Sequence, residues 1–283
     1  MTDREPSRTA VGVALMRAAH QLYDAIPKIL DDSVVLQLLS PAMLNHVRGT
    51  EDHYRAAGAT QLRSHLMIRS RYAEDRLAEA VQRGIRQFVS LGAGFDTFPY
   101  RQPMWARSLR IFEVDQPASQ RIKRERLEAG AILIPPNVEF VPIDFETTSL
   151  DDGLAASSFD PTLPTFFSWL GVMMYLTPEA NDAVFRYVLS LPRTSEIVFT
   201  FASPAAPERS AESARPSVAE LAARGGEPWL TRIDPDVLTA HLLELGFTSV
   251  VLPTPEQIEA WYIQDRQDGL HASPRRTIAS AIV

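Results

Sequence analysis

The 283-residue chain contains no cysteine, which excludes disulfide bonds, thiolate zinc sites and cysteine nucleophiles, and we predict no metal site. Lysine is nearly absent too: Lys28 and Lys123 are the two lysines among 28 basic residues. We interpret this bias as genome composition rather than a binding function. The 35 acidic residues give a net charge of −7, and this acidic balance argues against a nucleic-acid partner.

Long apolar runs are also lacking. No stretch approaches the roughly 20 apolar residues that a membrane helix needs, and the polar segment Met1–Arg8 has no signal-peptide character. We therefore expect no membrane partner and a cytoplasmic protein. With 45% hydrophobic residues, the chain is long and apolar enough for one elaborated domain, residues 1–283, with a sizeable core.

The first 85 residues predict helices and no strands, so we interpret residues 1–85 as a helical cap. The apolar residues recur at helical spacing, and proline or glycine interrupts the pattern between segments. Three helical stretches are expected, over residues 10–24, 33–39 and 54–83, followed by Pro27, Pro41 and Gly84.

The pattern changes after residue 85, where short apolar runs alternate with amphipathic segments. This alternation predicts βαβ units and a parallel, doubly wound α/β sheet. The runs show little polar alternation, which fits strands covered on both faces. We predict strands at 87–91, 110–115, 138–145, 165–172, 196–202, 248–253 and 276–283, and helices at 116–129, 179–191, 235–245 and 256–265.

A polar segment rich in proline, residues 203–230, interrupts this pattern. Its middle, Val218–Arg224, has helical character. We expect this segment to be a mobile lid over a cleft, between a cofactor-binding half (86–202) and C-terminal strands and helices (231–283).

A glycine-containing turn, Leu91–Thr97, follows the first predicted strand. Glycine at positions 92 and 94 lets the backbone turn sharply and approach a ligand closely. The dinucleotide-binding pattern has a third glycine where this chain has Thr97, so no helix that binds a pyrophosphate is indicated. A tight turn without a ligand is the alternative interpretation.

Acidic residues end the next two predicted strands. Asp115 lies about 20 residues beyond the glycine turn, the spacing of a ribose-binding carboxylate, although it also suits a helix cap. Asp144 can accept a hydrogen bond from an adenine amine while Phe145 packs on the ring. Carboxylates without a basic cluster indicate an adenosine ligand that has no phosphate, and S-adenosylmethionine is such a ligand.

Five segments, in the right order and spacing, resemble the leucine carboxyl methyltransferase family, and most closely its bacterial S-adenosylmethionine-dependent branch. The resemblance implies a class I methyltransferase (Rossmann-like) fold, a seven-stranded sheet with the last strand antiparallel and a helical cap over the cofactor. The five segments are Arg69–Leu77, Gln87–Arg101, Phe112–Pro117, Phe140–Glu146 and Phe166–Ala180.

The resemblance also implies roles for individual residues. Arg69 would pair with the methionine carboxylate of the cofactor, and Trp169 would lie beside the cofactor or serve as a core aromatic. Leu170 stands where the eukaryotic enzymes carry a glutamate, so the resemblance does not extend to their protein-phosphatase substrate. The other implied positions are Gly92, Ala93, Gly94 and Asp96 around the methionine, Asp115 and Gln116 at the ribose, and Asp144 and Phe145 at the adenine.

The methyl acceptor stays open. A carboxylate acceptor is ionised at neutral pH and needs no base, whereas a hydroxyl acceptor needs one. We predict an S-adenosylmethionine-dependent O-methyltransferase acting on a small molecule; a non-catalytic cofactor-binding protein and an NAD-dependent oxidoreductase are the alternatives. The catalytic candidates are His20, Tyr23, His53 and Tyr175, with Tyr54 and Trp229 as possible pocket walls.

Overall fold

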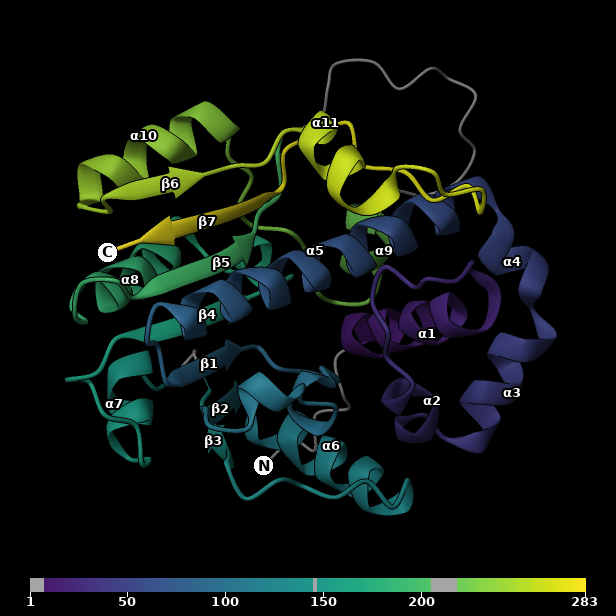
Figure 1. Ribbon diagram of the computed structural model, residues 1–283, viewed down its shortest axis with the longest axis horizontal. Coiled ribbons are helices and arrows are strands. Elements are labelled where there is room, and N and C mark those ends of the chain that lie inside the picture. The colour runs from purple at the N-terminus through teal and green to yellow at the C-terminus, as the bar shows by residue number, and fades with distance from the viewer. Residues whose placement is uncertain (1–7, 145–146, 205–217) are drawn as a thin grey trace.

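A computed structural model describes residues 8–144, 147–204 and 218–283. Its centre is a seven-stranded sheet in the order β3-β2-β1-β4-β5-β7-β6, in which β7 runs antiparallel to both neighbours (Figure 1). This confirms the expected sheet and its antiparallel last strand. The strands are β1 (Gln87–Leu91), β2 (Arg110–Asp115), β3 (Val138–Pro142), β4 (Thr165–Trp169), β5 (Glu196–Thr200), β6 (Ser249–Val251) and β7 (Ile278–Ile282).

The three central strands, β1, β4 and β5, are buried at every position. They form the middle of the sheet because their sequences are apolar on both faces, so that helices can cover each side. Val89 of β1 lies in register with Phe112 of β2 and with Phe167 of β4. The carboxyl ends of these strands therefore meet at one edge, where open α/β sheets bind ligands.

Helices cover both faces of the sheet, which confirms the doubly wound prediction. One core lies under α5 (Ala57–Gln82), the short helices η1 (Phe98–Tyr100) and η2 (Met104–Ala106), and α11 (Pro255–Ile258) with the π-helical turn η4 (Glu259–Ile263). The other core lies under α7 (Leu150–Ala155), α8 (Pro178–Leu189) and α10 (Pro235–Leu245). The other helices that follow β1 along the chain are α6 (Pro117–Ala129), η3 (Met173–Tyr175) and α9 (Val218–Arg224).

Four helices form the cap at the carboxyl edge of the sheet (Figure 1). They share a small apolar core, against which Phe95 of the glycine turn packs. The fifth and longest helix of the first 85 residues, α5, departs from the expected cap, because it lies on β4 and β5 rather than beyond them. The cap helices are α1 (Arg8–Tyr23), α2 (Val34–Leu38), α3 (Pro41–Gly49) and α4 (Glu51–Arg55).

Helix α3 was not expected, because Pro41 was interpreted as a helix breaker. Pro41 is instead the first residue of the helix, where its missing N–H costs nothing. The Ser40 side chain caps the helix by accepting a hydrogen bond from the Met43 N–H at 3.3 Å.

The predicted lid is described only in part, since residues 205–217 lie outside the described ranges; its helix α9 is confirmed.

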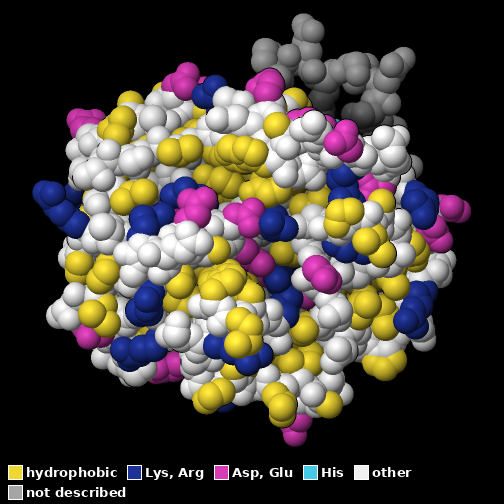
Figure 2. Space-filling model, in the orientation of Figure 1, with side chains coloured by type: hydrophobic (Ala, Val, Ile, Leu, Met, Phe, Trp, Pro, Cys, Tyr) yellow, Lys and Arg dark blue, Asp and Glu magenta, His cyan; other side chains and the backbone are white. Residues whose placement is uncertain are grey.

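Among the described residues, no helix has both the length and the apolar character needed to cross a bilayer. The longest helix, α5, carries an outward row of ion pairs, Arg71–Asp75 and Arg76–Glu79. Figure 2 shows blue and magenta side chains lying close together near the middle of this face of the molecule.

Gly92 permits the turn after β1, because its φ is +66° and a Cβ there would lie 2.4 Å from Cγ2 of Val172. We expect Gly92→Ala to lower the free energy of unfolding by about 1–3 kcal/mol through crowding and about 1–2 kcal/mol more through backbone strain. Urea denaturation measures the loss. The double variant Gly92→Ala/Val172→Ala should recover only the stability lost through crowding. Gly84→Ala should lose stability through backbone strain alone, because φ is +104° there and the space around the Cβ is open. An unchanged stability in Gly92→Ala would contradict the packing described here.

Candidate cofactor site

The glycine turn is tied to the neighbouring strand. The N–H groups of Gly92 and Ala93 donate to the Val114 carbonyl at 2.8 and 3.1 Å, and the Gly94 N–H donates to Oδ2 of Asp115 at 2.5 Å. Gly94, with a φ of +45°, faces the start of α1, where a Cβ would contact Ala10 at 3.4 Å. The turn therefore lies between the end of β1 and the cap, with its backbone fixed by Asp115.

Asp115 ends β2 at the same edge as the turn. Its Oδ1 accepts from the Gln116 N–H at 2.7 Å, and Gln116 is the N-cap of α6. Burial raises the pKa of Asp115, although these backbone hydrogen bonds oppose the shift. Asp144, partly buried, follows β3 one strand further along; Phe145, its expected partner at an adenine, lies outside the described residues.

Arg69 lies on α5 over the end of β4. A Cβ on Gly171, just after β4, would come within 2.8 Å of Nη1 and 3.0 Å of Nη2 of Arg69. The Arg69 Nε is buried without a hydrogen-bond partner, and no carboxylate of the described residues forms an ion pair with this guanidinium. Burial, followed by the charge of Arg17, lowers the pKa of Arg69 to about 10. Arg69 is thus a cation beside the turn with no ion-pairing carboxylate in the part of the chain that the structure describes.

Asp96 is already paired. Arg17 of α1 donates to Asp96 at 3.0 Å and to Asp32 at 3.3 Å, and the Thr97 hydroxyl donates to Asp32 at 2.7 Å. Burial acts to raise the pKa of Asp96, but Arg17 and more distant basic groups outweigh it and lower the pKa. This network joins the cap to the glycine turn and pairs the Asp96 carboxylate with Arg17.

A small pocket lies between α5 and the ends of β1 and β4. Its polar lining is Ser70, Glu74, Asp96 and Ser168, and Leu170 forms part of its apolar wall. Glu74 is held by two hydrogen bonds from Arg101. The position where the eukaryotic family members carry glutamate is therefore an apolar surface next to the turn.

Three of the catalytic candidates lie away from this site. His20 is fully buried, with Nδ1 2.7 Å from Asp24 and Nε2 accepting from the Leu30 N–H at 3.4 Å. Tyr23 donates to the Val47 carbonyl at 2.6 Å, at the opposite end of α1 from Ala10 and about 20 Å along the helix. His53 is exposed on α4, beside the buried Tyr54. The geometry favours structural roles for these residues.

Tyr175 and Trp229 lie nearer the turn. Tyr175 is the last residue of η3. It lies close enough to Arg69 to act against burial and raise the pKa of the Arg69 guanidinium. The Trp229 segment is attached to η3, since the Leu230 N–H donates to the Met174 carbonyl at 2.7 Å. It also reaches α1 through a hydrogen bond between Thr9 and Glu227, and the Trp229 Nε1 is buried without a partner among the described groups.

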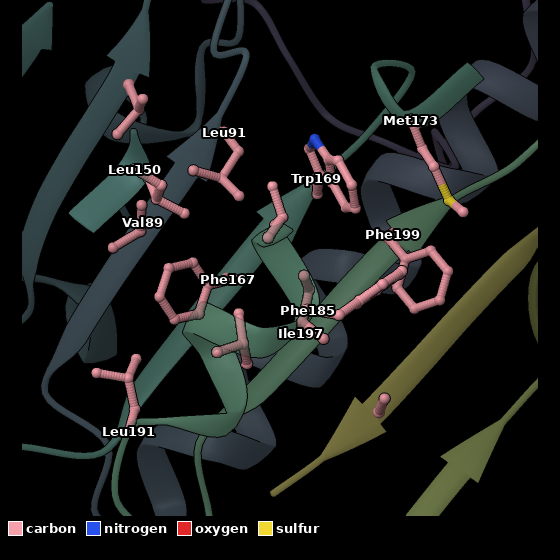
Figure 3. Close-up of a cluster of buried hydrophobic side chains, with 14 of the residues drawn as sticks. Val89, Leu91, Leu150, Phe167, Trp169, Met173, Phe185, Leu191, Ile197 and Phe199 are labelled. Carbon is pink, nitrogen blue, oxygen red and sulfur yellow. The ribbon is translucent and has the colours of Figure 1, made fainter. Parts of the chain in front are cut away.

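Trp169 lies inside the core. Its side chain is fully buried, with its ring centroid 5.5 Å from that of Phe185 and 6.5 Å from that of Phe199 (Figure 3). Of the two interpretations of Trp169, the structure supports the core aromatic, because the ring packs under α8 on the face of the sheet opposite α5.

Sequence reasoning did not single out His65, which lies one helical turn before Arg69 on α5. Burial, and then the charge of Arg69, lower the pKa of His65 to about 3, so its imidazole is neutral at physiological pH. A spacing of four residues on one helix could have indicated that the two side chains are neighbours. Arg17, inside the apolar run Val11–Ala19, carried a comparable signal of a buried partner.

The pKa of His65 predicts an acid-sensitive fold. In the unfolded chain His65 takes up a proton near pH 6.5, whereas in the folded chain it stays neutral. The free energy of unfolding is therefore unaffected by His65 well above pH 6.5 and falls as the pH drops below it. Between pH 7.5 and 5.5 we expect His65 to account for a loss of about 1 kcal/mol. Urea denaturation of His65→Gln should show a smaller loss than wild type, with the exposed His53→Gln as control. Equal losses in all three proteins would contradict this environment.

Residues 10–189 match the leucine carboxyl methyltransferase family. The chain belongs to this family. It is therefore a methyltransferase. The Bacillus subtilis protein YktD, named provisionally as an S-adenosyl-L-methionine-dependent methyltransferase, is 32% identical over 96% of both chains. A Mycolicibacterium smegmatis protein with the same provisional name is 29% identical over 81% of this chain and 66% of its own.

Solved structures agree on the fold of this methyltransferase. A DUF574 family protein from Streptomyces avermitilis superposes with a TM-score of 0.55 at 18% identity, covering 96% of this chain and 95% of its own. A Thermobifida fusca protein described provisionally as a methyltransferase gives the same TM-score and identity, over 98% and 94% of the two chains. At this identity the likeness concerns the arrangement of the strands and helices alone.

Proposed function

We propose that this methyltransferase uses S-adenosylmethionine to methylate a carboxylate or hydroxyl oxygen of a small molecule. The observation that carries the proposal is Arg69: a partly buried guanidinium beside Gly171, with an enclosed Nε that has no partner and no ion pair in the described part of the chain. Buried cations are normally paired, so this one is suited to a ligand anion. The methionine carboxylate of the cofactor is such an anion.

The remaining groups fit the rest of that ligand. Gly92 and Gly94 place no side chain at two positions of the turn, and their positive φ angles keep the chain close to the ends of β1 and β2. Asp115 has oxygen lone pairs beyond those used by Gly94 and Gln116, which suits ribose hydroxyls. Asp144, at the end of the next strand, would face the adenine.

When bound, the cofactor supplies a methyl group on a sulfonium, and displacement by the acceptor oxygen releases a neutral thioether. The chain's own contribution is positioning: Arg69 would hold the methionine carboxylate of the cofactor, and Asp115 would hold its ribose hydroxyls. A carboxylate acceptor needs no base. His20 has both ring nitrogens engaged and His53 is distant, which favours an acceptor that is already ionised.

An NAD-dependent oxidoreductase fits less well. Thr97 replaces the third glycine, and its hydroxyl is buried against Asp32. Residues 92–109, all of them described, contain the three-residue helices η1 and η2 and no α-helix whose N-terminus could bind a pyrophosphate.

Calorimetric titration with S-adenosylhomocysteine and with NADH tests the proposal. We expect saturable binding of S-adenosylhomocysteine and none of NADH, and the reverse would overturn the proposal. Turnover of labelled S-adenosylmethionine against a panel of small acids and phenols then separates an enzyme from a protein that only binds the cofactor. Sustained transfer to any acceptor supports catalysis, and binding without transfer to any of them supports the non-catalytic alternative.

A further inference from the structure

Trp229 carries a buried N–H group that the described part of the chain leaves unpaired. Its indole Nε1 is enclosed and has no hydrogen-bond partner among the described residues, although the side chain as a whole is only partly buried. The Arg232 guanidinium lies 5.4 Å from the centre of the indole ring, over one of its faces. A buried indole N–H normally has a partner, so this one is suited to an acceptor atom on a ligand.

The segment that contains Trp229, residues 227–231, is tied down at both ends, and we call it the strap. At one end Glu227 accepts a hydrogen bond from the hydroxyl of Thr9, in the first turn of α1. At the other end the N–H groups of the last two strap residues donate to the Met174 carbonyl at 2.7 and 3.2 Å. Because consecutive Cα atoms are about 3.8 Å apart, the Trp229 Cα lies within about 8 Å of the Cα atoms at both ends of the strap.

The first attachment lies next to the glycine turn. Thr9 precedes Ala10 on α1, and a Cβ on Gly94 would contact the Ala10 side chain at 3.4 Å. The start of α1 therefore connects the strap to the turn that would receive the methionine part of the cofactor.

The second attachment lies near Arg69. Met174 is three residues beyond Gly171, where a Cβ would come within 2.8 Å of the Arg69 guanidinium. Val172, between Gly171 and Met174, packs so closely on the glycine turn that a Cβ on Gly92 would lie 2.4 Å from its side chain. The strap thus connects the surroundings of Arg69 with the turn, the two groups that would hold the methionine part of the cofactor.

We propose that the Trp229 indole N–H donates a hydrogen bond to the methionine carboxylate of the cofactor, beside the Arg69 guanidinium. This inference rests on the proposed function, because it adds a second donor for the same carboxylate. A carboxylate has about four acceptor positions, so it can accept from the guanidinium and from the indole together. Since the indole is neutral, it adds a directed hydrogen bond without placing a second positive charge beside Arg69.

S-adenosylhomocysteine and methylthioadenosine are matched probes, since they share the adenosine and the sulfur and only the first carries the amino acid with its carboxylate. In calorimetric titrations, Trp229→Phe should bind S-adenosylhomocysteine about tenfold more weakly than wild type and methylthioadenosine equally well. Arg69→Gln should show the same selective loss. Trp261→Phe is the control, because Trp261 is 52% exposed and lies on η4, and it should leave the affinity for both probes unchanged.

The unliganded protein gives a second measurement. Phenylalanine keeps an apolar ring and removes the unpaired N–H, so the thermal midpoint of free Trp229→Phe should equal or exceed that of wild type. Thr9→Val removes the hydroxyl that holds Glu227 and should weaken S-adenosylhomocysteine selectively, by a smaller factor than Trp229→Phe. This variant decides the matter if Trp229→Phe does not fold, and unchanged binding would then overturn the inference.

The outcomes separate this inference from the proposed function. If Trp229→Phe weakens both probes equally, or lowers the midpoint of the free protein, the side chain supports the structure of the site and the assignment of its N–H is overturned. If Trp229→Phe binds S-adenosylhomocysteine as tightly as wild type, the inference about Trp229 is wrong and the cofactor proposal stands. If wild-type protein binds neither probe, the proposed function itself falls, and the inference falls with it.

Discussion

We expect Arg69→Gln to weaken S-adenosylhomocysteine binding about 10- to 100-fold. Hydrogen bonds to a charged group are worth about 1.5–3 kcal/mol, and each 1.4 kcal/mol is a factor of ten in affinity. Glutamine retains an amide donor but is shorter than arginine and carries no charge. Calorimetry measures the change, with Arg71→Gln as the control: Arg71 lies on the same helix, is 45% exposed and pairs with Asp75 at the surface.

The same substitution makes an unusual prediction for the unliganded protein. Because the Arg69 guanidinium is paired with no carboxylate of the described residues, removing its charge relieves desolvation rather than breaking an ion pair. We expect the thermal midpoint of free Arg69→Gln to equal or exceed that of wild type while the ligand-induced rise shrinks. A loss of both stability and affinity would instead indicate a structural role for Arg69.

The second large effect concerns the attachment of the cap, and we expect Asp24→Ala to lower the free energy of unfolding by about 3–5 kcal/mol. Arg63 of α5 donates to the two carboxylate oxygens of Asp24 at 2.7 and 2.8 Å, and Arg63 is 2% exposed. Removing Asp24 leaves a buried guanidinium without its anion. Urea denaturation measures the loss.

Asp31→Ala is the matched control for Asp24→Ala. Asp31 lies seven positions further along the chain, is exposed, and should change stability by no more than about 0.5 kcal/mol when truncated. A similar small loss in Asp24→Ala would show that α1 is held to α5 by other contacts. His20 should be affected with Asp24, because its Nδ1 loses the same partner.

Much of the sheet was predictable because its central strands are apolar on both faces. The apolar runs in β1, β4 and β5 are too short to span a membrane, so strands in the core of a sheet were the natural interpretation. All three are buried at every position in the structure. Helix α10, bounded by Pro235 at its start and Gly246 after its end, was predicted to the residue. Predicted strand ends were too long at β3 to β7, because apolar residues continue into the turns at the carboxyl edge.

The glycine turn, Asp115 and Asp144 were predictable because they follow strands directly, and the structure brings all three to one edge. The network of Arg17 with Asp32 and Asp96 was not, since it joins residues 15 and 79 positions apart that only the folded cap brings together. Short-range patterns do not reveal such pairs.

A crystal structure with S-adenosylhomocysteine bound tests the central claim most directly. We predict that the ligand carboxylate lies within hydrogen-bonding distance, about 3 Å, of the Arg69 guanidinium, with the ribose at Asp115 and the sulfur facing the end of β4. The claim would be contradicted if the ligand occupied another site, or if Arg69 turned to a carboxylate of the protein and left the ligand unpaired.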